Sequence, residues 1–517
     1  MKLVTLLALF VASAITPSFA YNVLCIFPVP SRSHNHLAKG VVDSLLQAGH
    51  KVTWASPFPD KKAVKNLKYI DVSETVKIVE GIDMTKKRNE EMSFVIAFSR
   101  NISTVAASNK QLREVLVKEQ FDAVVTEYFF SDLPAGFAAV QQAPWIMLNG
   151  IMMTPGLEIL VDEVRSVSTI PFVMTDATIP MNYWERLTNT FLTSTILYRT
   201  WKQRQDTSDL YQTLFSPLAE ARGVSLEPLS SAVYNTSIVF LNSHPSISPA
   251  YPLPPNVIEV AGYHIDEDTP PLPKDLQELL DSSPGGVVYF SMGSVVKSST
   301  LPLKTRQDIL KVLAELPYTV LWKFEEKIEG LPKNVHTRAW MPQSSILAHP
   351  NVKLFITHGG MLSTLEAVHH GVPLLAVPVF GDQPSNAARA VRAGYALSVP
   401  YEEDLAPRLK ETLKKMLSDD RYYNKAKYLS KLFRARPVSQ KKLIAHYVEI
   451  AIESKGAYHL RSNSRFYSWY QRMMLDQLAG VLLVLYLVYY ILKRTAIKLF
   501  GKTKKEDLDK RKSKKNK

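Results

Sequence analysis

The sequence of 517 residues is poor in features that would define several common protein classes. It contains one cysteine, Cys25, which excludes an intrachain disulfide. Cys25 lies in the apolar run 23–27, so we expect a buried structural thiol rather than a nucleophile. No G-x-G-x-x-G motif stands at a strand–helix junction, which argues against a dehydrogenase, and no internal repeat indicates a solenoid or propeller. The hydrophobic content of 46% is enough to bury two ordinary cores.

Positive charge is concentrated at the C-terminal end. The formal net charge is +14, but the segment from Lys493 to Lys517 holds twelve Lys or Arg against three Asp or Glu. The rest of the chain is therefore only mildly basic. Basic composition here gives no signal for a nucleic-acid partner.

The N-terminus has the pattern of a secretory signal. A charged start at Met1-Lys2 precedes an apolar run over 3–15 and the small residues Ser18 and Ala20, which predicts a signal peptide over residues 1–20. A retained membrane helix is the alternative, disfavoured by the short apolar run. Two glycan acceptors, Asn101 and Asn235, fit passage through the secretory pathway.

A second apolar segment lies near the C-terminus. Residues 478–492 carry no charge and are followed at once by Lys493-Arg494. Fifteen residues are fewer than the roughly 20 that an average bilayer needs, but extension toward Met473 and snorkelling of the flanking charges close the gap. We predict a transmembrane helix over 475–493 and a basic cytosolic tail over 494–517, because positive charge follows the apolar segment. A buried core helix is the alternative.

Between these segments, strand-like and helix-like stretches alternate, which predicts parallel sheets. We expect an N-terminal domain over 21–245, a Pro-rich linker region over 246–285, and a second domain with its final helices over 286–455. The helical, aromatic-rich stretch 181–218 has three open interpretations: a cover for a ligand pocket, a membrane contact, or packing between domains.

The most informative stretch is Trp340 to Gln383. A strand-like run over 352–357 leads into His358-Gly359-Gly360, a helix-forming segment, and a second strand-like run over 374–377. This is one βαβ unit whose turn presents backbone N–H groups and the positive end of a helix dipole. The turn therefore predicts a site for a nucleoside diphosphate.

The same stretch resembles a known signature. W-x-P-Q at 340–343, H-G-G at 358–360, Glu366 and the pair Asp382-Gln383 are similar to the donor signature of the animal UDP-glycosyltransferases, and the resemblance covers essentially the whole chain. Leu362-Ser363, where vertebrate members usually carry Asn-Gly, resembles the invertebrate branch. The resemblance implies two facing Rossmann-like αβα domains of the GT-B type, with the final helices crossing back to the first domain. It also implies a single-pass type I protein of the endoplasmic reticulum membrane with a luminal active site and a dilysine signal at Lys514 and Lys515.

Transfer of a sugar to a hydroxyl needs a base, for which a neutral imidazole is well suited. The family resemblance places that base at His34, sixteen residues before the Gly49-His50 turn, with His36 as the competitor. We expect His34 to lie in a loop before the first helix. The family pattern F-D-x-x-x-x-D becomes F-D-A-V-V-T-E over 121–127, so Glu127 takes the place of the Asp that orients the base. Whether the longer side chain reaches the imidazole is open, and Asp132 is the less favoured substitute.

We expect the donor site to be built from residues of the second domain. Trp340 offers a face for uracil, Gln343 binds the nucleoside, and Glu366 accepts hydrogen bonds from the ribose. Asp382 and Gln383 match the pair that binds sugar hydroxyls. The diphosphate contacts are expected from Ser291, Gly293, Ser294, His358, Gly359, Gly360 and Ser363. Leu362 removes one polar contact that the family pattern provides.

No metal or cofactor is expected beyond UDP-sugar as co-substrate. The motif D-x-D, which holds a cation in another class of glycosyltransferases, occurs at Asp266-Glu-Asp268 and Asp507-Leu-Asp509. The first lies in the Pro-rich region and the second in the basic tail, and neither follows a buried strand, so both are interpreted as solvated charges.

These expectations combine into one hypothesis: an inverting, metal-independent transfer of a hexose, by resemblance glucose, from UDP-sugar to a small lipophilic hydroxyl acceptor. Glucuronosyl transfer from UDP-glucuronate is one alternative. A lipid glycosyltransferase and a non-catalytic, membrane-anchored binding protein are the others. The sequence gives no oligomeric state.

Overall fold

The computed structural model describes residues 20–60, 62–80, 91–161, 167–172, 175–177, 179–250, 252–294, 296–402 and 404–516. The expected signal peptide, apart from Ala20, lies outside these residues. The chain divides into two units, one up to Arg461 and a second from Ser462 onward.

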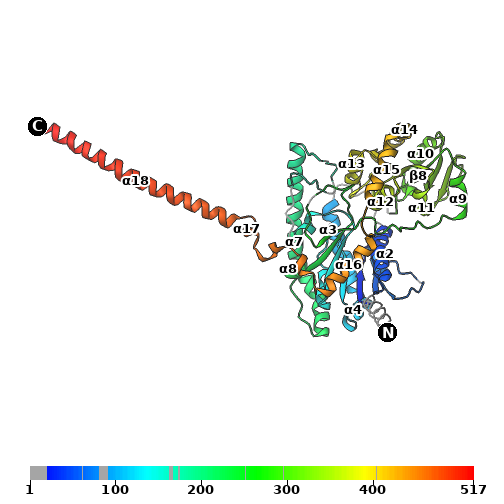
Figure 1. The fold of residues 1–517 in the computed structure, drawn as a ribbon, viewed down its shortest axis with the longest axis horizontal. Helices are drawn as coiled ribbons and strands as arrows, with labels where there is room; N and C mark the ends of the chain where they lie inside the picture. The colour runs from blue at the N-terminus through cyan, green and yellow to red at the C-terminus, as the bar shows by residue number, and fades with distance from the viewer. Residues whose placement is uncertain are drawn as a thin grey trace, which may run out of the picture. The chain divides into compact units, whose positions relative to one another are not determined.

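The first unit contains two parallel sheets (Figure 1). The first has seven strands in the order β3-β2-β1-β4-β5-β6-β7. Its central strands are buried along almost their whole length, as expected for a parallel sheet with both faces covered. The strands are β1 (Asn22–Ile26), β2 (Lys51–Ser56), β3 (Leu67–Asp71), β4 (Ala123–Glu127), β5 (Trp145–Asn149), β6 (Thr236–Leu241) and β7 (Val257–Glu259).

The second sheet has six strands in the order β10-β9-β8-β11-β12-β13, again all parallel. They are β8 (Val287–Ser291), β9 (Thr319–Lys323), β10 (Val335–Arg338), β11 (Val352–Thr357), β12 (Leu374–Ala376) and β13 (Ala396–Ser398). The alternation of strands and helices predicted both sheets, and this prediction is confirmed.

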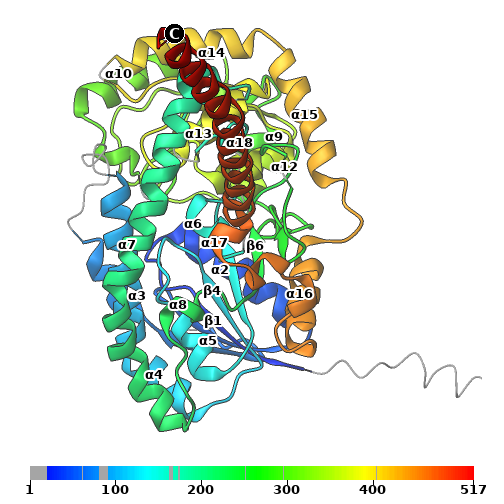
Figure 2. The ribbon, with the colours of Figure 1, turned by 90° about the vertical axis from the view of Figure 1, so that its left-hand side faces the viewer.

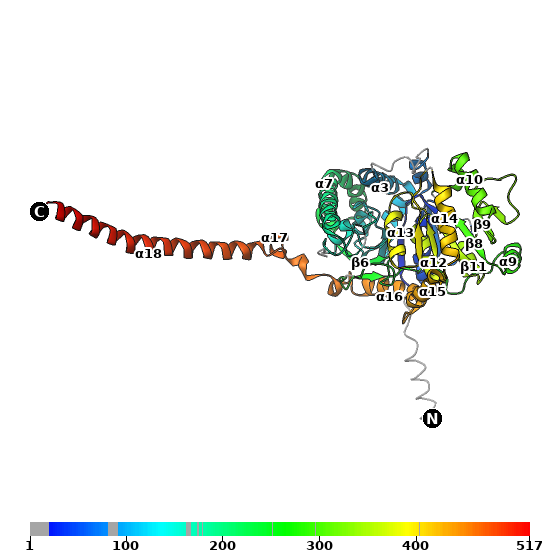
Figure 3. The same ribbon diagram turned by 90° about the horizontal axis from the view of Figure 1, so that it is seen from above.

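Helices cover the faces of both sheets. Those of the first half are α2 (Arg32–Gln47), α3 (Glu91–Ser108), α4 (Lys110–Lys118), α5 (Ala135–Gln141), α6 (Pro155–Glu158), α7 (Tyr183–Arg222) and α8 (Leu229–Ala232). Those of the second half are α9 (Lys274–Asp281), α10 (Leu303–Ala314), α11 (Gln343–Ala348), α12 (Met361–His370), α13 (Gln383–Arg392), α14 (Leu405–Leu417), α15 (Arg421–Arg434) and α16 (Gln440–Glu453). Short 3-10 turns occur at Ser73–Ile78, Ser298–Thr300, Tyr458–Leu460 and Asn463–Phe466. Figure 3 shows α12, α13 and α14 beside β8, β9 and β11.

Helix α16 returns to the first sheet after the second has been completed. Its apolar residues Ile444, Val448 and Ala451 are buried in the same cluster as Val23 and Cys25 of β1. The expectation that the final helices cross back to the first domain therefore agrees with the packing. The thiol of Cys25 is fully buried, as predicted.

The expected linker, residues 246–285, contains regular structure. Strand β7 joins the edge of the first sheet beside β6, and Leu276 and Leu280 of α9 pack into a cluster of the second sheet. These short elements were included in the predicted linker because Pro-rich and acidic segments lie around them. The domain boundaries remain a prediction.

The second unit consists of α17 (Trp469–Arg472) and α18 (Leu475–Lys515). Within α18, the 24-residue stretch Leu475–Lys498 contains an 18-residue window with a mean hydropathy of 1.9, and this window is not buried against other parts of the structure. It is the one candidate for a membrane span in the described part of the chain. The apolar helix is longer than the fifteen uncharged residues because it continues past Lys493 and Arg494 without a break.

Candidate active site

Both sheets reverse their strand order at one point, and each reversal marks a place for a ligand. In open parallel sheets, ligands bind outside the carboxyl ends of the two strands at which the order reverses. In the first sheet these strands are β1 and β4, and in the second they are β8 and β11. His34 follows β1, Glu127 ends β4, and His358 follows β11, so the fold positions three predicted residues at these points.

The imidazole of His34 is held by Glu127. Nδ1 of His34 makes a short hydrogen bond to Oε1 of Glu127, whose carboxylate is buried. The longer Glu side chain therefore reaches the imidazole, which answers the question that the sequence left open. Ser31, in extended conformation, precedes a helix that begins at Arg32, so His34 lies in the first turn of α2 and not, as expected, in a loop before the helix.

The surroundings of His34 raise its pKa. Burial by itself lowers the pKa, but attraction to the Glu127 carboxylate and the hydrogen bond between them outweigh it, and Asp382 acts in the same direction. Asp382 precedes α13 of the second half, so a carboxylate of that half contributes to the electrostatics of His34. The pair therefore has the arrangement of a base with an orienting carboxylate.

Two other acids near Glu127, Asp122 and the less favoured substitute Asp132, have other partners. Asp122 accepts a hydrogen bond from the backbone of Asn22 at 2.7 Å and so positions the start of β1. Asp132 forms a buried ion pair with Arg204, with Nε and Oδ2 2.7 Å apart. These contacts assign both carboxylates to structure.

The competitor His36 and the turn residue His50 have other contacts. The ring of His36 packs edge-on against that of His264, with 5.6 Å between centroids. His50 is fully buried, and its Nε2 lies 3.2 Å from Oε1 of Glu449 on α16. His50 therefore links the first sheet to the returning helix.

On the donor side, His358 lies between two glycines. A Cβ on Gly293 would lie 2.6 Å from Cε1 of His358, and one on Gly360 would lie 2.4 Å from its Nε2. Neither position has room for a side chain. Burial lowers the pKa of His358 to about 4, and the charge of Lys323 acts in the same direction. The imidazole is therefore neutral near pH 7 and acts as a hydrogen-bonding group rather than a cation.

Backbone geometry around this turn agrees with a diphosphate site. Gly359 has φ +80°, a conformation that favours glycine, and its N–H donates to Oγ1 of Thr357 at 3.3 Å. Gly360 is the N-cap of α12 and carries no side chain to close the helix end. Ser291 ends β8, where its Oγ accepts from the N–H of Gly293, and Ser294 follows in the same turn. The helix end and the β8 turn therefore lie on either side of His358.

Gln343, Ser363 and Glu366 form one hydrogen-bonded group. Nε2 of Gln343 donates to Oγ of Ser363 at 3.0 Å and to Oε2 of Glu366 at 2.7 Å. Burial raises the pKa of Glu366 to about 7, against the opposing effect of the Gln343 hydrogen bond. Three residues predicted from the sequence therefore lie together. The hydrogen bond between Gln343 and Glu366 was not predicted.

Asp382 is tied to the His358 turn by a residue that the sequence analysis missed. Nδ2 of Asn386 donates to Oδ2 of Asp382 at 2.6 Å and to the carbonyl of Gly359 at 3.0 Å. Asn386 lies one helical turn after Asp382, so an i, i+4 pairing was the available signal. Gln383 uses its side-chain oxygen to accept from the N–H groups of Val379 and Phe380, so it shapes the loop before α13.

Lys323 is a second residue that the sequence analysis missed. It ends β9 at the same edge of the sheet, is buried, and donates from Nζ to the carbonyl of Gly293 at 2.9 Å and to Glu325 at 2.8 Å. Its Nζ also lies 5.9 Å from the ring centre of Trp340. Trp340 itself is 67% exposed, which agrees with a ring face open to a nucleobase rather than with core packing. A charged residue that ends a buried strand was the signal for Lys323.

Leu362 has a packing role that accounts for its apolar character. It lies on α12 of the second half and packs against the buried cluster of the first sheet that includes Phe27 and Leu37. An apolar residue is favoured here because this partly buried position packs against apolar side chains of the first half.

The predicted glycan acceptors lie at different places in the first half. Asn101 is exposed on α3. Asn235 is also exposed, and its side-chain oxygen accepts a hydrogen bond from Nη1 of Arg461 at 2.9 Å. Their glycosylation remains a prediction.

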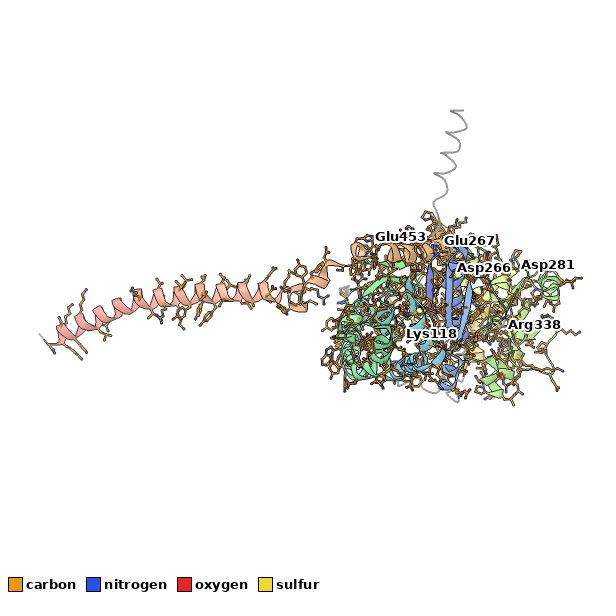
Figure 4. The ribbon with its side chains drawn as sticks, turned by 90° about the horizontal axis from the view of Figure 1, so that it is seen from below. Lys118, Asp266, Glu267, Asp281, Arg338 and Glu453 are labelled. Carbon is orange, nitrogen blue, oxygen red and sulfur yellow. The ribbon has the colours of Figure 1, made fainter. Side chains whose placement is uncertain are left out.

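The D-x-D motif at residues 266–268 is exposed, and Asp266 and Glu267 are labelled in Figure 4. Asp266 pairs with Nζ of Lys441 at 2.7 Å. The second motif, Asp507-Leu-Asp509, lies in α18. No cluster of His, Cys, Asp and Glu suited to a metal ion occurs among the residues with described positions.

Two doubly wound parallel sheets, each with a group of polar residues at its reversal point, define the GT-B fold. The solved structures that the fold resembles agree. The glycosyltransferase of kitacinnamycin has a TM-score of 0.57 and 18% identity over 85% of this chain and 100% of its own. The calicheamicin glycosyltransferase CalG4 has a TM-score of 0.55 and 16% identity over 84% and 99%.

Sequence comparison then gives the family. Residues 23–510 match the family described as "UDP-glucoronosyl and UDP-glucosyl transferase". UDP-glucosyltransferase 2 of Dactylopius coccus is 33% identical, with 98% of this chain and 99% of the relative covered. UDP-glucuronosyltransferase 2B7 of Homo sapiens is 27% identical, with 91% and 92% covered. The chain therefore belongs to the UDP-glucuronosyl and UDP-glucosyl transferase family, and it is an enzyme that transfers a hexose from a UDP-sugar.

Proposed function

We propose that this enzyme transfers glucose from UDP-glucose to a hydroxyl of a small lipophilic acceptor, with inversion at the anomeric carbon and without a metal ion. The observation that supports this most directly is the hydrogen bond of His34 Nδ1 to Glu127, with Asp382 of the donor half close enough to influence the same imidazole. A base and a sugar-binding carboxylate are then near one another, from opposite halves of the fold.

In the proposed reaction, Nε2 of His34 takes the proton of the acceptor hydroxyl as its oxygen forms a bond to the anomeric carbon. The bond from that carbon to the diphosphate oxygen breaks, and UDP leaves. Glu127 holds Nδ1–H and stabilises the imidazolium that forms. General base catalysis of this kind contributes about 10²–10⁴ in rate.

The donor half would bind UDP-sugar through the groups described above. Trp340 would stack on uracil, and Glu366 would accept from the ribose. The N-terminus of α12, His358 and Lys323 would meet the diphosphate. Asp382 would accept from sugar hydroxyls on the side nearest His34.

A lipophilic acceptor is favoured by aromatic side chains around the base. The ring of Phe129 meets that of His34 edge-on, with centroids 5.1 Å apart. Phe98 and Phe130 lie 6.3 Å and 5.8 Å from Phe129 by the same measure. An apolar wall next to a base favours a hydroxyl carried on an apolar body.

Glucose is preferred because UDP-glucosyltransferase 2 is the relative with 33% identity, whereas the glucuronosyltransferase 2B7 has 27%. Glucuronosyl transfer is the second candidate. For location, we propose a type I anchor in the endoplasmic reticulum membrane, with Lys514 and Lys515 as the retrieval signal. The apolar helix Leu475–Lys498 followed by a basic tail supports this.

The proposal is tested with the purified full-length chain in detergent, a panel of phenolic and aliphatic alcohol acceptors, and UDP-glucose in competition with UDP-glucuronate. We expect UDP release and a glucoside identified by mass spectrometry. His34→Ala is expected to lower kcat by about 10²–10⁴ while UDP affinity measured by calorimetry stays within twofold. His36→Ala is the matched control and should keep its activity.

Three results would contradict the proposal. Equal activity of His34→Ala and the wild type would exclude His34 as the catalytic base. UDP binding without turnover of any acceptor would indicate a binding protein. Activity confined to a membrane-embedded lipid acceptor would indicate a lipid glycosyltransferase.

A further inference from the structure

The N-terminal half of α7 has its polar and apolar faces reversed. The side facing the rest of the structure buries Asn189, Thr193, Ile196, Thr200 and Arg204. The opposite side exposes large apolar residues, with Trp184 at 71%, Phe191 at 69%, Tyr198 at 60% and Trp201 at 56%, together with Leu187. A surface helix in water shows the opposite arrangement.

Two polar residues on the buried side, Asn189 and Arg204, hold the helix in this rotation through contacts with other segments. The side chain of Asn189 accepts from the N–H of Phe172 at 2.7 Å and donates to the carbonyl of Ile170 at 2.9 Å. Arg204 forms its ion pair with Asp132. Because this side is anchored by hydrogen bonds, the apolar side must face outward.

The C-terminal half of the same helix is ordinary. It buries Tyr211, Leu214, Phe215 and Leu218, and it exposes polar residues such as Gln212 and Glu220. Figure 2 shows α7 running along the outside of the first unit beside α3 and α4. The reversal is therefore confined to about five turns at one end, and we define the exposed residues 184, 187, 191, 198 and 201 as the aromatic stripe.

We propose that the aromatic stripe lies in the headgroup region of a lipid bilayer, with α7 parallel to the membrane surface. Trp and Tyr are the residues that favour this region, because one part of the ring is apolar and the other forms hydrogen bonds. The stripe is accompanied by exposed cations at Arg199 and Lys202, which suit anionic lipid headgroups.

The covalent structure of the chain favours a bilayer over a soluble partner. The candidate membrane helix begins at Leu475, and thirteen residues (462–474) separate it from Arg461, the last residue of the first unit. A fully extended chain of that length spans at most about 45 Å. The first unit is therefore held close to whatever membrane the helix crosses, at a high local concentration of lipid.

The test relies on site-directed spin labelling. Cys25 is the single cysteine of the sequence, so a Cys25→Ala background contains no native thiol. Single spin labels are placed by Phe191→Cys and Tyr198→Cys on the stripe and by Gln212→Cys and Glu220→Cys on the polar end of the same helix. The full chain is reconstituted at one copy per nanodisc in phosphatidylcholine with phosphatidylserine, and variants are used only when they still bind UDP.

We expect labels 191 and 198 to be at least threefold more accessible to oxygen than to a water-soluble nickel chelate, and labels 212 and 220 to show the reverse. Equal accessibility of all four labels to the nickel chelate overturns the proposal. A second result also overturns the proposal. In it, labels 191 and 198 are protected from the nickel chelate only at higher loading, where spin–spin broadening appears, and not at one copy per disc. The stripe would then bind a second copy of the chain.

Discussion

Gly360 lies so close to His358 that a Cβ at position 360 would fall 2.4 Å from Nε2 of the imidazole. The backbone of Gly360 has φ −62°, which any residue adopts. The need for glycine at this position is therefore set by the neighbouring imidazole and not by backbone conformation. A substitution at Gly360 should therefore change the shape of the proposed diphosphate site without straining the backbone of the turn.

The first prediction follows from this contact. We expect Gly360→Ala to displace His358 and to weaken UDP binding about tenfold, measured by calorimetry. Its melting temperature should change little, because the substitution introduces no backbone strain. Gly330→Ala is the matched control: Gly330 has φ +67° and no atom within 4 Å of its would-be Cβ, so it should lose stability and keep UDP affinity. Unchanged UDP affinity in Gly360→Ala would contradict the role of His358.

The second prediction concerns pH and the base. Burial lowers the pKa of His34, but Glu127 raises it by more, so the pKa lies above the ordinary histidine value. The neutral imidazole that acts as the base is therefore populated only above this raised pKa. Activity should therefore rise with pH through that pKa. Glu127→Gln removes the negative charge, so we expect the acid limb of the kcat/KM profile to move to lower pH while the maximal rate falls about 10²-fold. An unshifted limb would show that another group titrates.

Glu127→Asp tests the reach of the carboxylate. The shorter side chain ends one methylene before the position of Oε1 and should lose its direct contact with Nδ1. We expect a fall in kcat with little change in KM for UDP-sugar, because the donor half is untouched. Full activity in this variant would indicate that the first turn of α2, which carries His34, adjusts to either acid.

The third prediction concerns the pH dependence of UDP binding. Burial raises the pKa of Glu366 to about 7. In the proposed donor complex, ribose hydroxyls would donate to the ionised carboxylate. Below pH 7 the carboxyl group must lose its proton on binding, so the affinity for UDP should fall about tenfold between pH 8 and pH 6. UDP itself titrates in this range, and Glu366→Gln serves as the control: its pH dependence should keep only the contribution of the nucleotide. Identical slopes for both proteins would exclude Glu366 as the group responsible.

The fourth prediction concerns metal ions. The diphosphate would be met by the N-terminus of α12, by His358 and by Lys323, which together supply hydrogen bonds and positive charge. We expect turnover to persist within twofold after dialysis against EDTA. Loss of activity that Mg²⁺ or Mn²⁺ restores would show that a cation carries the leaving-group charge. Lys323→Met should raise KM for UDP-sugar about tenfold without a metal requirement.

Prediction from sequence succeeded where the signal was local. The strand over 352–357, the His358-Gly359-Gly360 turn and the helix after it are specified by neighbouring residues, and the structure has β11 and α12 at those places. The position of Glu127 at the end of a buried strand was likewise readable from the run that precedes it. The start of α2 was placed too late, because Arg32 to His36 are polar and the apolar periodicity begins only at Leu37.

Other features depended on contacts between distant segments. Lys323 and Asn386 reach the donor site through neighbours on other strands and turns, Gly293 and Gly360 matter because both lie against His358, and Leu362 packs on a core that begins at residue 23. The sequence by itself determined the elements, the chemistry of their ends and the family. Only the tertiary structure decided which of those ends meet, because contact between strands and helices far apart in the chain is set by packing and not by local periodicity. The reversed faces of α7 show the same limit: the helix was readable from its residues, but which side it buries was decided by hydrogen bonds to segments elsewhere.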